Sequence, residues 1–326
     1  MSVCSQLDNK VVLKANAPTI VDQVSKMTTN IPVDKRGVYS YEDFNKVSLG
    51  DIQNQKDLSD ADLHKELQKI LKFKGDKNTN SFVGNKVLYH YQFRNLLKCR
   101  RQGKDLIHEI MENDEKRHKL ICNALKLGRA GNPANRMFEA YRMRGSIVMF
   151  KASAAKFLYK KYKATSVLDP TSGWGGRMLG AWGVCKYTGI DTNTNMKPMY
   201  DDMILKTDSV NLRMIWDDCL KVDFSTIGYD FVLTSPPYSN MEIYEEMTPW
   251  ATDEIFYKEF LIPLIDKCRK YCKKGGKICF NISPKMYEDI LALGYEPAHA
   301  DEDLLQQLGQ QHNTSKKQDK IYIWNV

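Results

Sequence analysis

The sequence lacks any apolar run long enough to cross a bilayer, and its start lacks the compact apolar core of a secretory signal peptide. It also lacks the bias of collagen-like or fully disordered chains, because hydrophobic residues make up 42% and charged residues 27% of its 326 residues. We therefore expect a soluble, intracellular, globular protein with one large domain or two smaller ones.

Metal-binding patterns are missing as well. The eight cysteines are scattered, and no pair has the C-x2-C spacing of a zinc site. Cys268 and Cys272 lie four residues apart in an expected helix, where free cysteine packs as a small hydrophobe. The six histidines show no ligand spacing either. We expect reduced thiols and no metal.

Positive charge is what the sequence has in excess, and it is concentrated in one region. The chain carries 48 basic and 40 acidic side chains, for a net charge of +8. Residues 61–165 alone carry 24 basic and 9 acidic side chains (+15), whereas residues 1–60 sum to −1 and residues 166–326 to −6. So basic a region predicts contact with a polyanion, nucleic acid being the first candidate, although solvated helix faces would give the same composition.

Aromatic residues accompany the cations of this region. Tyr89, Tyr91 and Phe93 precede a group of cations, and rings mixed with cations are typical of surfaces that bind bases and phosphates. Rings at this spacing are also common in helix cores. The cations that we select as candidates for nucleic-acid binding are Lys98, Arg100, Arg101 and Lys104.

The hydrophobic pattern divides the chain into three segments. Residues 1–58 form a polar extension, residues 59–135 a basic helical region, and residues 136–326 a segment that comes to alternate between strand and helix. The periodicity predicts early helices over about 59–75, 85–102, 104–127 and 135–163. Consecutive helices of this kind fit an αα-hairpin or a helix-turn-helix unit.

After Thr165, short apolar runs alternate with helical spans, which is the pattern of an α/β protein with a parallel sheet. The predicted strands are Ser166–Leu168, Tyr187–Ile190, Arg213–Trp216, Phe231–Leu233, Lys277–Ile282 and Ile321–Trp324. The predicted helices between them cover about 175–184, 196–205, 253–272 and 284–293.

A glycine-rich turn follows the first predicted strand. Its sequence, DPTSGWGG, places Gly173 and Gly175 between the strand and a helix, where backbone can approach a ligand and free N–H groups can face it. The dinucleotide pattern G-x-G-x-x-G fails, because its third glycine would fall at Met178. The turn therefore predicts a nucleotide-type cofactor other than NAD.

Acidic residues follow three successive predicted strands. Asp169 ends the first, Asp191 ends the second, and Asp217 and Asp218 follow the third. Carboxyl ends of parallel strands meet at one edge of a sheet, and an acid after the second strand can accept both hydroxyls of a ribose. Together the acids predict a ligand that contains adenosine.

The fourth predicted strand runs into the sequence TSPPY. Two prolines cannot continue a central strand, and they fix the directions of the neighbouring carbonyls. If the Pro236 carbonyl and the Ser235 hydroxyl hydrogen-bond to an exocyclic amine and its neighbouring ring nitrogen, the amine can aim its lone pair at a methyl group, with Tyr238 stacked on the base. No cysteine follows the proline pair, which argues against methylation at cytosine C5.

DPTSGWGG followed by TSPPY resembles the S-adenosylmethionine-dependent amino-methyltransferases of DNA, particularly the compact enzymes of phages and large viruses. The resemblance covers about residues 150–324 and implies a Rossmann-like, doubly wound α/β sheet beside an N-terminal helical region. It implies a methyltransferase domain at 136–326, DNA recognition by residues 59–135, and a role in DNA methylation of the restriction-modification type.

The resemblance also implies roles for single residues. Cofactor contacts are implied for Asp169, Thr171, Gly173, Gly175, Asp191, Asp217, Asp218 and Thr234. Action on the target base is implied for Ser235, Pro236, Pro237 and Tyr238. The cofactor would be S-adenosylmethionine and the partner DNA.

Two departures from the family pattern qualify these expectations. Ser235 stands where adenine-specific members commonly have Asp or Asn, which favours cytosine N4 over adenine N6. Only about 65 residues separate the glycine turn from TSPPY and about 90 follow it, so recognition falls to the basic helical region. Methylation of RNA or of a protein glutamine, and a non-catalytic subunit that binds nucleic acid, are the alternatives.

Overall fold

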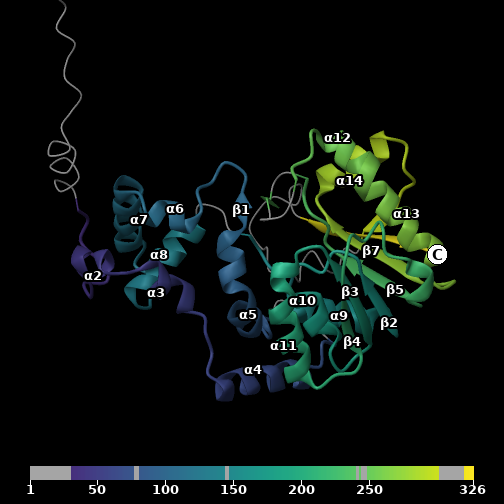
Figure 1. Cartoon of the computed structure of the whole chain (residues 1–326), viewed down its shortest axis with the longest axis horizontal. Coiled ribbons are helices and arrows are strands. Elements are labelled where there is room, and N and C mark those ends of the chain that lie inside the picture. Colours follow the sequence, from purple (N-terminus) through teal and green to yellow (C-terminus); the bar gives the residue numbers. More distant parts are fainter. Residues whose placement is uncertain (1–30, 77–80, 144–146, 240–241, 244–247, 301–318) are drawn as a thin grey trace, which may run out of the picture.

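The computed structural model describes residues 31–76, 81–143, 147–239, 242–243, 248–300 and 319–326. Most of the predicted polar extension, residues 1–30, lies outside this range. A helical part lies beside a part built on a sheet (Figure 1). None of the helices in the described ranges is both long and apolar enough to cross a membrane.

A seven-stranded mixed sheet forms the centre of the C-terminal part. The order across the sheet is β4-β3-β2-β5-β7-β9-β8, with β9 antiparallel to both of its neighbours and the other pairs parallel. Its strands are β2 (Ser166–Asp169), β3 (Lys186–Asp191), β4 (Leu212–Trp216), β5 (Phe231–Thr234), β7 (Lys277–Ile282), β8 (His299–Ala300) and β9 (Lys320–Asn325). The six predicted strands are confirmed, within one residue at each end.

Alternate residues of the strands face two separate cores, as the two-residue repeat of a strand requires. Val167 and Phe231 pack on one side and Leu168 and Val232 on the other. The first core is covered by α4 (Asp60–Lys72), α5 (Asn85–Lys98), α9 (Ala152–Lys161), α10 (Gly176–Ala181) and α11 (Lys197–Thr207). The second is covered by α12 (Asp253–Phe256), α13 (Ile262–Tyr271) and α14 (Pro284–Ala292). The α/β fold class is thereby confirmed.

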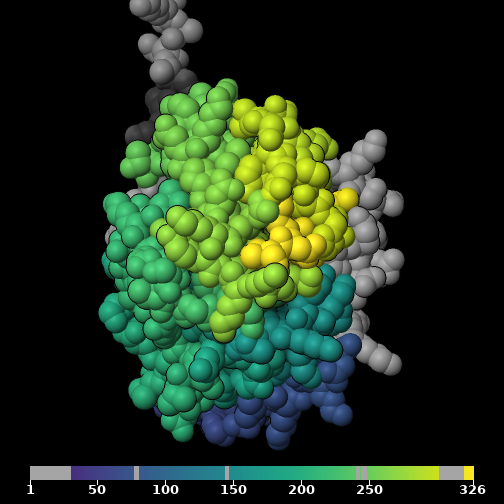
Figure 2. All heavy atoms as spheres, turned by 90° about the vertical axis from the view of Figure 1, so that its right-hand side faces the viewer, coloured from purple at the N-terminus to yellow at the C-terminus, as the bar shows by residue number. Residues whose placement is uncertain are grey.

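A third core holds the helical part together. It is formed by side chains of α2 (Tyr41–Asn45), α3 (Leu49–Asn54), α6 (Ile107–Met111), α7 (Asp114–Leu127) and α8 (Pro133–Arg142). Helix α5 joins the parts, because its Phe93 belongs to this core and its Leu88 to a core of the sheet. Figure 2 shows the side of the molecule that lies at the right of Figure 1; residues from α9 onward form most of this face, and earlier residues, coloured blue, form its lower edge.

Three helix predictions are wrong in detail. The long helix over 135–163 is two helices, α8 and α9, because residues 147–150 have no helical structure; Ile147 and Met149 are buried there and Val148 is exposed. The helix over 104–127 is also two, since the Asn113 side chain accepts from the Lys116 N–H at 2.9 Å and caps a new helix there.

The third correction concerns the basic segment. The predicted helix over 85–102 ends at Lys98, and residues Arg100–Arg101 form a short strand, β1, that pairs antiparallel with β6 (Glu242–Ile243). Strand β6 begins four residues after Tyr238. The basic region and the segment that follows TSPPY are therefore joined by backbone pairing.

Candidate active site

A cavity of about 420 Å³ opens at the carboxyl ends of the strands, where the strand order reverses between β2 and β5. Ligands of open α/β sheets bind at this kind of position. The glycine turn after β2, the acids after β3 and β4 and the TSPPY turn after β5 all contribute to its wall. Of the predicted site residues, the cavity is lined by Thr171, Gly173, Asp191, Asp217, Asp218, Ser235 and Pro237.

Asp169 lies behind this wall rather than in it. Its side chain is fully buried, and its carboxylate accepts from Arg177 Nε at 2.7 Å, Tyr187 Oη at 2.7 Å and Thr234 Oγ1 at 2.9 Å. Both carboxylate oxygens are thus engaged by the protein. Asp169 therefore positions the turn that follows it, and its side chain does not line the cavity.

Threonine hydroxyls connect the glycine turn to the TSPPY turn. Thr171 Oγ1 lies 2.6 Å from Thr234 Oγ1 and donates to the Ser235 carbonyl at 3.1 Å. Arg177 donates to the Thr171 carbonyl as well as to Asp169. Predicted as cofactor contacts, Thr234 and Asp169 instead form a buried network that fixes the distance between the two turns.

The three glycines of the turn serve different purposes. Gly173 has a φ of +56°, and a Cβ there would come no closer than 3.9 Å to other atoms, so its backbone faces open space at the cavity. Gly175 has a φ of +85° and precedes α10. Gly176 is required for packing, because a Cβ would lie 1.8 Å from the Phe150 carbonyl oxygen.

Asp191 is held at the cavity wall by backbone. Its carboxylate accepts from the Gly173 N–H at 2.7 Å and the Asn193 N–H at 2.9 Å. Burial raises the pKa of Asp191 to about 6, although both backbone donors favour the charged form. Each carboxylate oxygen accepts from one of these backbone N–H groups, and its remaining lone pair can accept a hydrogen bond from a ligand hydroxyl.

Asp217 and Asp218 lie on the same cavity after β4, as predicted. Asp218 Oδ1 accepts from the Leu220 N–H at 2.9 Å, and the Asp218 N–H donates to Asp217 Oδ1 at 2.7 Å. Asp217 is exposed and Asp218 is partly buried. Asp218 Oδ2 also lies 3.7 Å from Lys221 Nζ. Both acids therefore shape a tight turn, and Asp217 is the more exposed acceptor for a donor in the cavity.

The TSPPY turn is supported from β7. Asn281 Nδ2 donates to Ser235 Oγ at 3.3 Å, and Tyr238 Oη donates to the Asn281 carbonyl at 3.3 Å. Tyr238 also hydrogen-bonds to Asp319, whose pKa burial raises. Ser235 and Pro237 line the cavity, whereas Pro236 is buried beneath it. Asn281 is a supporting residue that the sequence reading missed.

Aromatic residues that we did not predict close the cavity. Trp174, Trp250 and Phe260 line it, and the rings of Trp250 and Phe260 lie 6.0 Å apart. Phe260 belongs to a π-helical turn, Tyr257–Leu261, inside the helix predicted over 253–272. Pro263 follows this turn and would clash with a carbonyl of a regular helix, which accounts for the wider turn.

The electrostatic character of the cavity is acidic. Its lining contains Asp191, Asp217 and Asp218 and no Lys, Arg or His among the described residues. Asn193 Oδ1 is buried near these acids without a hydrogen-bond partner in the described part of the chain. Such a cavity favours a ligand that is positively charged and rich in hydrogen-bond donors, and it disfavours phosphates.

The four cations predicted to bind nucleic acid lie around β1. Arg100 forms two hydrogen bonds with Glu109, with N–O distances of 3.1 and 2.5 Å, and so ties β1 to α6. Lys98 ends α5 and is exposed. Arg101 and Lys104 line a second, smaller cavity. Within the described residues, no group of three or more His, Cys, Asp or Glu is placed to hold a metal.

Comparisons with known proteins find likeness in structure only. No protein-family model matches the chain, and no curated protein matches its sequence. An rRNA methylase from Streptococcus thermophilus is 12% identical over 55% of this chain and 97% of its own, with a TM-score of 0.37. An S-adenosylmethionine-dependent methyltransferase from Clostridium acetobutylicum is 11% identical over 60% and 99%, with a TM-score of 0.38.

Proposed function

We propose that this protein transfers a methyl group from S-adenosylmethionine to the exocyclic amine of a base in DNA, with cytosine N4 preferred over adenine N6. The observation that carries the proposal is the acidic cavity at the strand switch, with the TSPPY turn in its wall. When bound, S-adenosylmethionine would supply the methyl group of its sulfonium to the acceptor nitrogen, and the electron pair of the broken carbon–sulfur bond would stay on the sulfur of S-adenosylhomocysteine.

The residues of the cavity fit this cofactor in their charge and in the hydrogen-bond acceptors that they offer. Asp191 accepts the two ribose hydroxyls, and Asp217 or Asp218 accepts the adenine amine. Gly173 gives the methionine end access to backbone, because no Cβ fills that side of the turn. The acids attract the positively charged sulfonium and ammonium groups, whereas a dinucleotide would bring phosphates against the same carboxylates.

The TSPPY turn acts on the acceptor base. The Pro236 carbonyl accepts a hydrogen bond from the amine, and the Ser235 hydroxyl, held by Asn281, donates to the neighbouring ring nitrogen, so that the amine loses conjugation with the ring. Tyr238 stacks on the base, a contact of about 1–3 kcal/mol. The base must leave the duplex to reach this turn, at a cost of a few kcal/mol. The proton released from the amine passes to solvent or to a neighbouring carboxylate.

The test is to incubate the protein with methyl-labelled S-adenosylmethionine and, separately, DNA, RNA and protein. We expect label in DNA, and N4-methylcytosine among the nucleosides identified by mass spectrometry after digestion. Tyr238→Leu should lower turnover about tenfold or more while cofactor affinity, measured by calorimetry, stays within about twofold, because stacking acts on the base.

Other outcomes would replace the proposal in defined ways. N6-methyladenine would keep DNA as the substrate and overturn the choice of base. Label in RNA or in protein glutamine alone would overturn DNA. If the protein binds no S-adenosylmethionine, it is not an enzyme of this class, and a non-catalytic subunit that binds nucleic acid becomes the better account.

A further inference from the structure

The second cavity lies in the helical part and differs from the first in charge. It has a volume of about 150 Å³ and lies between α5, the β1 segment, α6 and α8. Three cations, Arg101, Lys104 and Arg142, line it together with Tyr89 and Tyr141. We call this cavity the basic pocket.

Positive charge exceeds negative charge in the basic pocket. Its one acidic lining residue, Asp105, is paired with Lys116 at 2.9 Å. Arg142 is paired with Glu139 at 2.9 Å and is exposed at the rim. Lys56 adds a further cation, with its Nζ 5.6 Å from the centre of the Phe138 ring in the pocket wall. The balance favours an anionic ligand.

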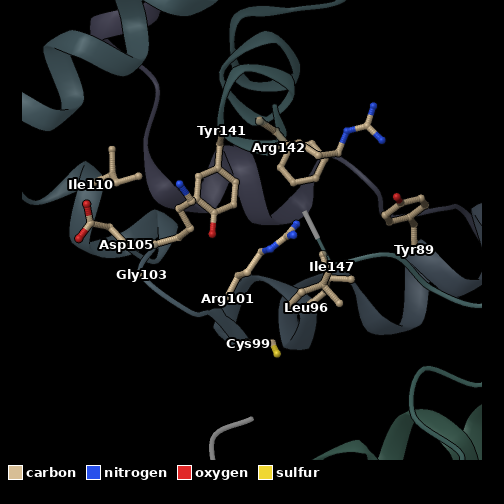
Figure 3. Close-up of a pocket in the computed structure, with 12 residues that line it drawn as sticks. Tyr89, Leu96, Cys99, Arg101, Gly103, Asp105, Ile110, Tyr141, Arg142 and Ile147 are labelled. Atoms are coloured by element: carbon tan, nitrogen blue, oxygen red, sulfur yellow. The ribbon is translucent and has the colours of Figure 1, made fainter. Parts of the chain in front are cut away.

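The rings and the cations of the pocket line the same cavity. Figure 3 shows the Arg101 side chain and the Tyr141 hydroxyl pointing towards the middle of the pocket, and the Arg142 guanidinium pointing outward. Phe138, Leu96 and Ile147 supply a buried apolar wall. A cation beside a ring and an apolar wall suits a flat group joined to a phosphate, which is the chemistry of a nucleotide.

The position of the pocket indicates which nucleotide it takes. Arg101 lies on β1 opposite Glu242 of β6, and the neighbouring Cys99 Sγ lies 3.6 Å from the Ile243 carbonyl. Because β6 begins four residues after Tyr238, Arg101 of the pocket lies on a strand that pairs with the segment following the TSPPY turn. A DNA strand with its target base at Tyr238 would run beside β1 and β6.

We propose that the basic pocket binds a nucleotide of the substrate strand that flanks the target base, with Arg101 on its phosphate and Tyr141 against its base or sugar. The inference rests on the proposed function for the identity of the strand. Arg101 is chosen because it lines the pocket, whereas Arg100, which pairs with Glu109, does not. The pocket serves as a second point of attachment that fixes the strand while the target base is out of the duplex.

The experiment compares Arg101→Gln, Tyr141→Leu and Arg129→Gln with the unmodified protein in binding a short fluorescently labelled DNA duplex. Arg129 is an exposed cation of the same helical part and does not line the pocket, so its variant removes the same charge elsewhere. We expect Tyr141→Leu to weaken binding about fivefold to a hundredfold, as loss of one stacked base does. Arg101→Gln should weaken binding about tenfold, and Arg129→Gln less than about threefold.

Two further measurements make each outcome decisive. Cofactor affinity and thermal unfolding should match the unmodified protein in all three variants, and Arg101→Lys should restore part of the affinity. If the unmodified protein methylates DNA but the pocket variants bind as Arg129→Gln does, the pocket inference is wrong and the function stands. If the unmodified protein binds no DNA, both are wrong. If free nucleoside monophosphate binds as tightly as the duplex, the pocket serves a soluble nucleotide instead.

Discussion

Protonation of Asp191 should affect both the stability of the protein and its affinity for the ligand. Burial raises its pKa to about 6, so the carboxyl stays protonated in the folded protein over a pH range in which an unfolded chain has lost that proton. Its contribution to stability is therefore full below about pH 4 and is lost as the pH rises through about 6. Ligand hydroxyls that donate to the carboxylate offset this loss.

The affinity for S-adenosylmethionine should consequently rise with pH through about 6 and fall about tenfold per pH unit below it. Asp191→Asn should weaken binding about tenfold to a hundredfold at neutral pH, because hydrogen bonds to a charged acceptor are lost. It should also flatten the profile. Calorimetry between about pH 5 and 8 measures both effects, and a variant with the same pH profile would assign the titration to another group.

Single residues were the part of the site that the sequence predicted best. Asp191, Asp217, Asp218 and Gly173 could be placed because each lies at the end of a strand or within four residues after it, and strand ends meet at one edge. Asp169 follows a strand too, but its engagement with Arg177 depends on a helix position that spacing does not reveal. Nothing in the local pattern marked Asn281 as the support of Ser235.

At the scale of elements, the strands were predictable and the early helices less so. Each central strand is a short apolar run between turn residues. Residues 147–150 are also apolar, but we predicted them as part of a helix, whereas the structure has no helix there and buries Ile147 and Met149 while Val148 is exposed. The strands β1 and β6 have two residues each, which is too short for any periodicity. Their pairing is set by tertiary structure.

The contact between α10 and the chain before α9 gives a test at this scale. Gly176→Ala should destabilise the fold by about 1–3 kcal/mol or more, because the new Cβ would lie 1.8 Å from the Phe150 carbonyl oxygen and backbone must shift. The control is Gly50→Ala in α3, where the nearest atom is 3.6 Å away. That change should be neutral or stabilise by up to about 1 kcal/mol.

Urea unfolding followed by circular dichroism measures both changes. Cofactor binding by Gly176→Ala should weaken as well, since the same glycine opens the helix that follows the Gly173 turn. Equal stabilities for the two variants would show that the Phe150 segment gives way easily, and would remove the packing explanation for Gly176.

For the whole molecule, the uneven distribution of charge could be read from the sequence, but the two cavities around which the charged side chains gather could not. The structure lines one cavity with carboxylates, of which Asp218 is paired with Lys221, and the other with three cations. Strand β1, which carries Arg101 of the second cavity, pairs with β6. The helical part is also more closely integrated than an extension up to residue 58 suggests. Asp34 forms a buried ion pair with Arg136 of α8, and this pair holds the pKa of Asp34 far below its usual range.

The two proposed ligands should respond to salt to very different degrees. DNA binding that neutralises about six phosphates should weaken about a thousandfold between 50 and 200 mM salt, because counterions are released on binding. Binding of S-adenosylmethionine should change less than about threefold, since the contacts we propose for it with Asp191 and Asp217 would be shorter than the Debye length. Titrations of each ligand over the same salt series measure the contrast. A parallel loss of both affinities would mean that salt acts on the fold as a whole, and a flat DNA curve would mean that the +15 region merely solvates the surface of the helices.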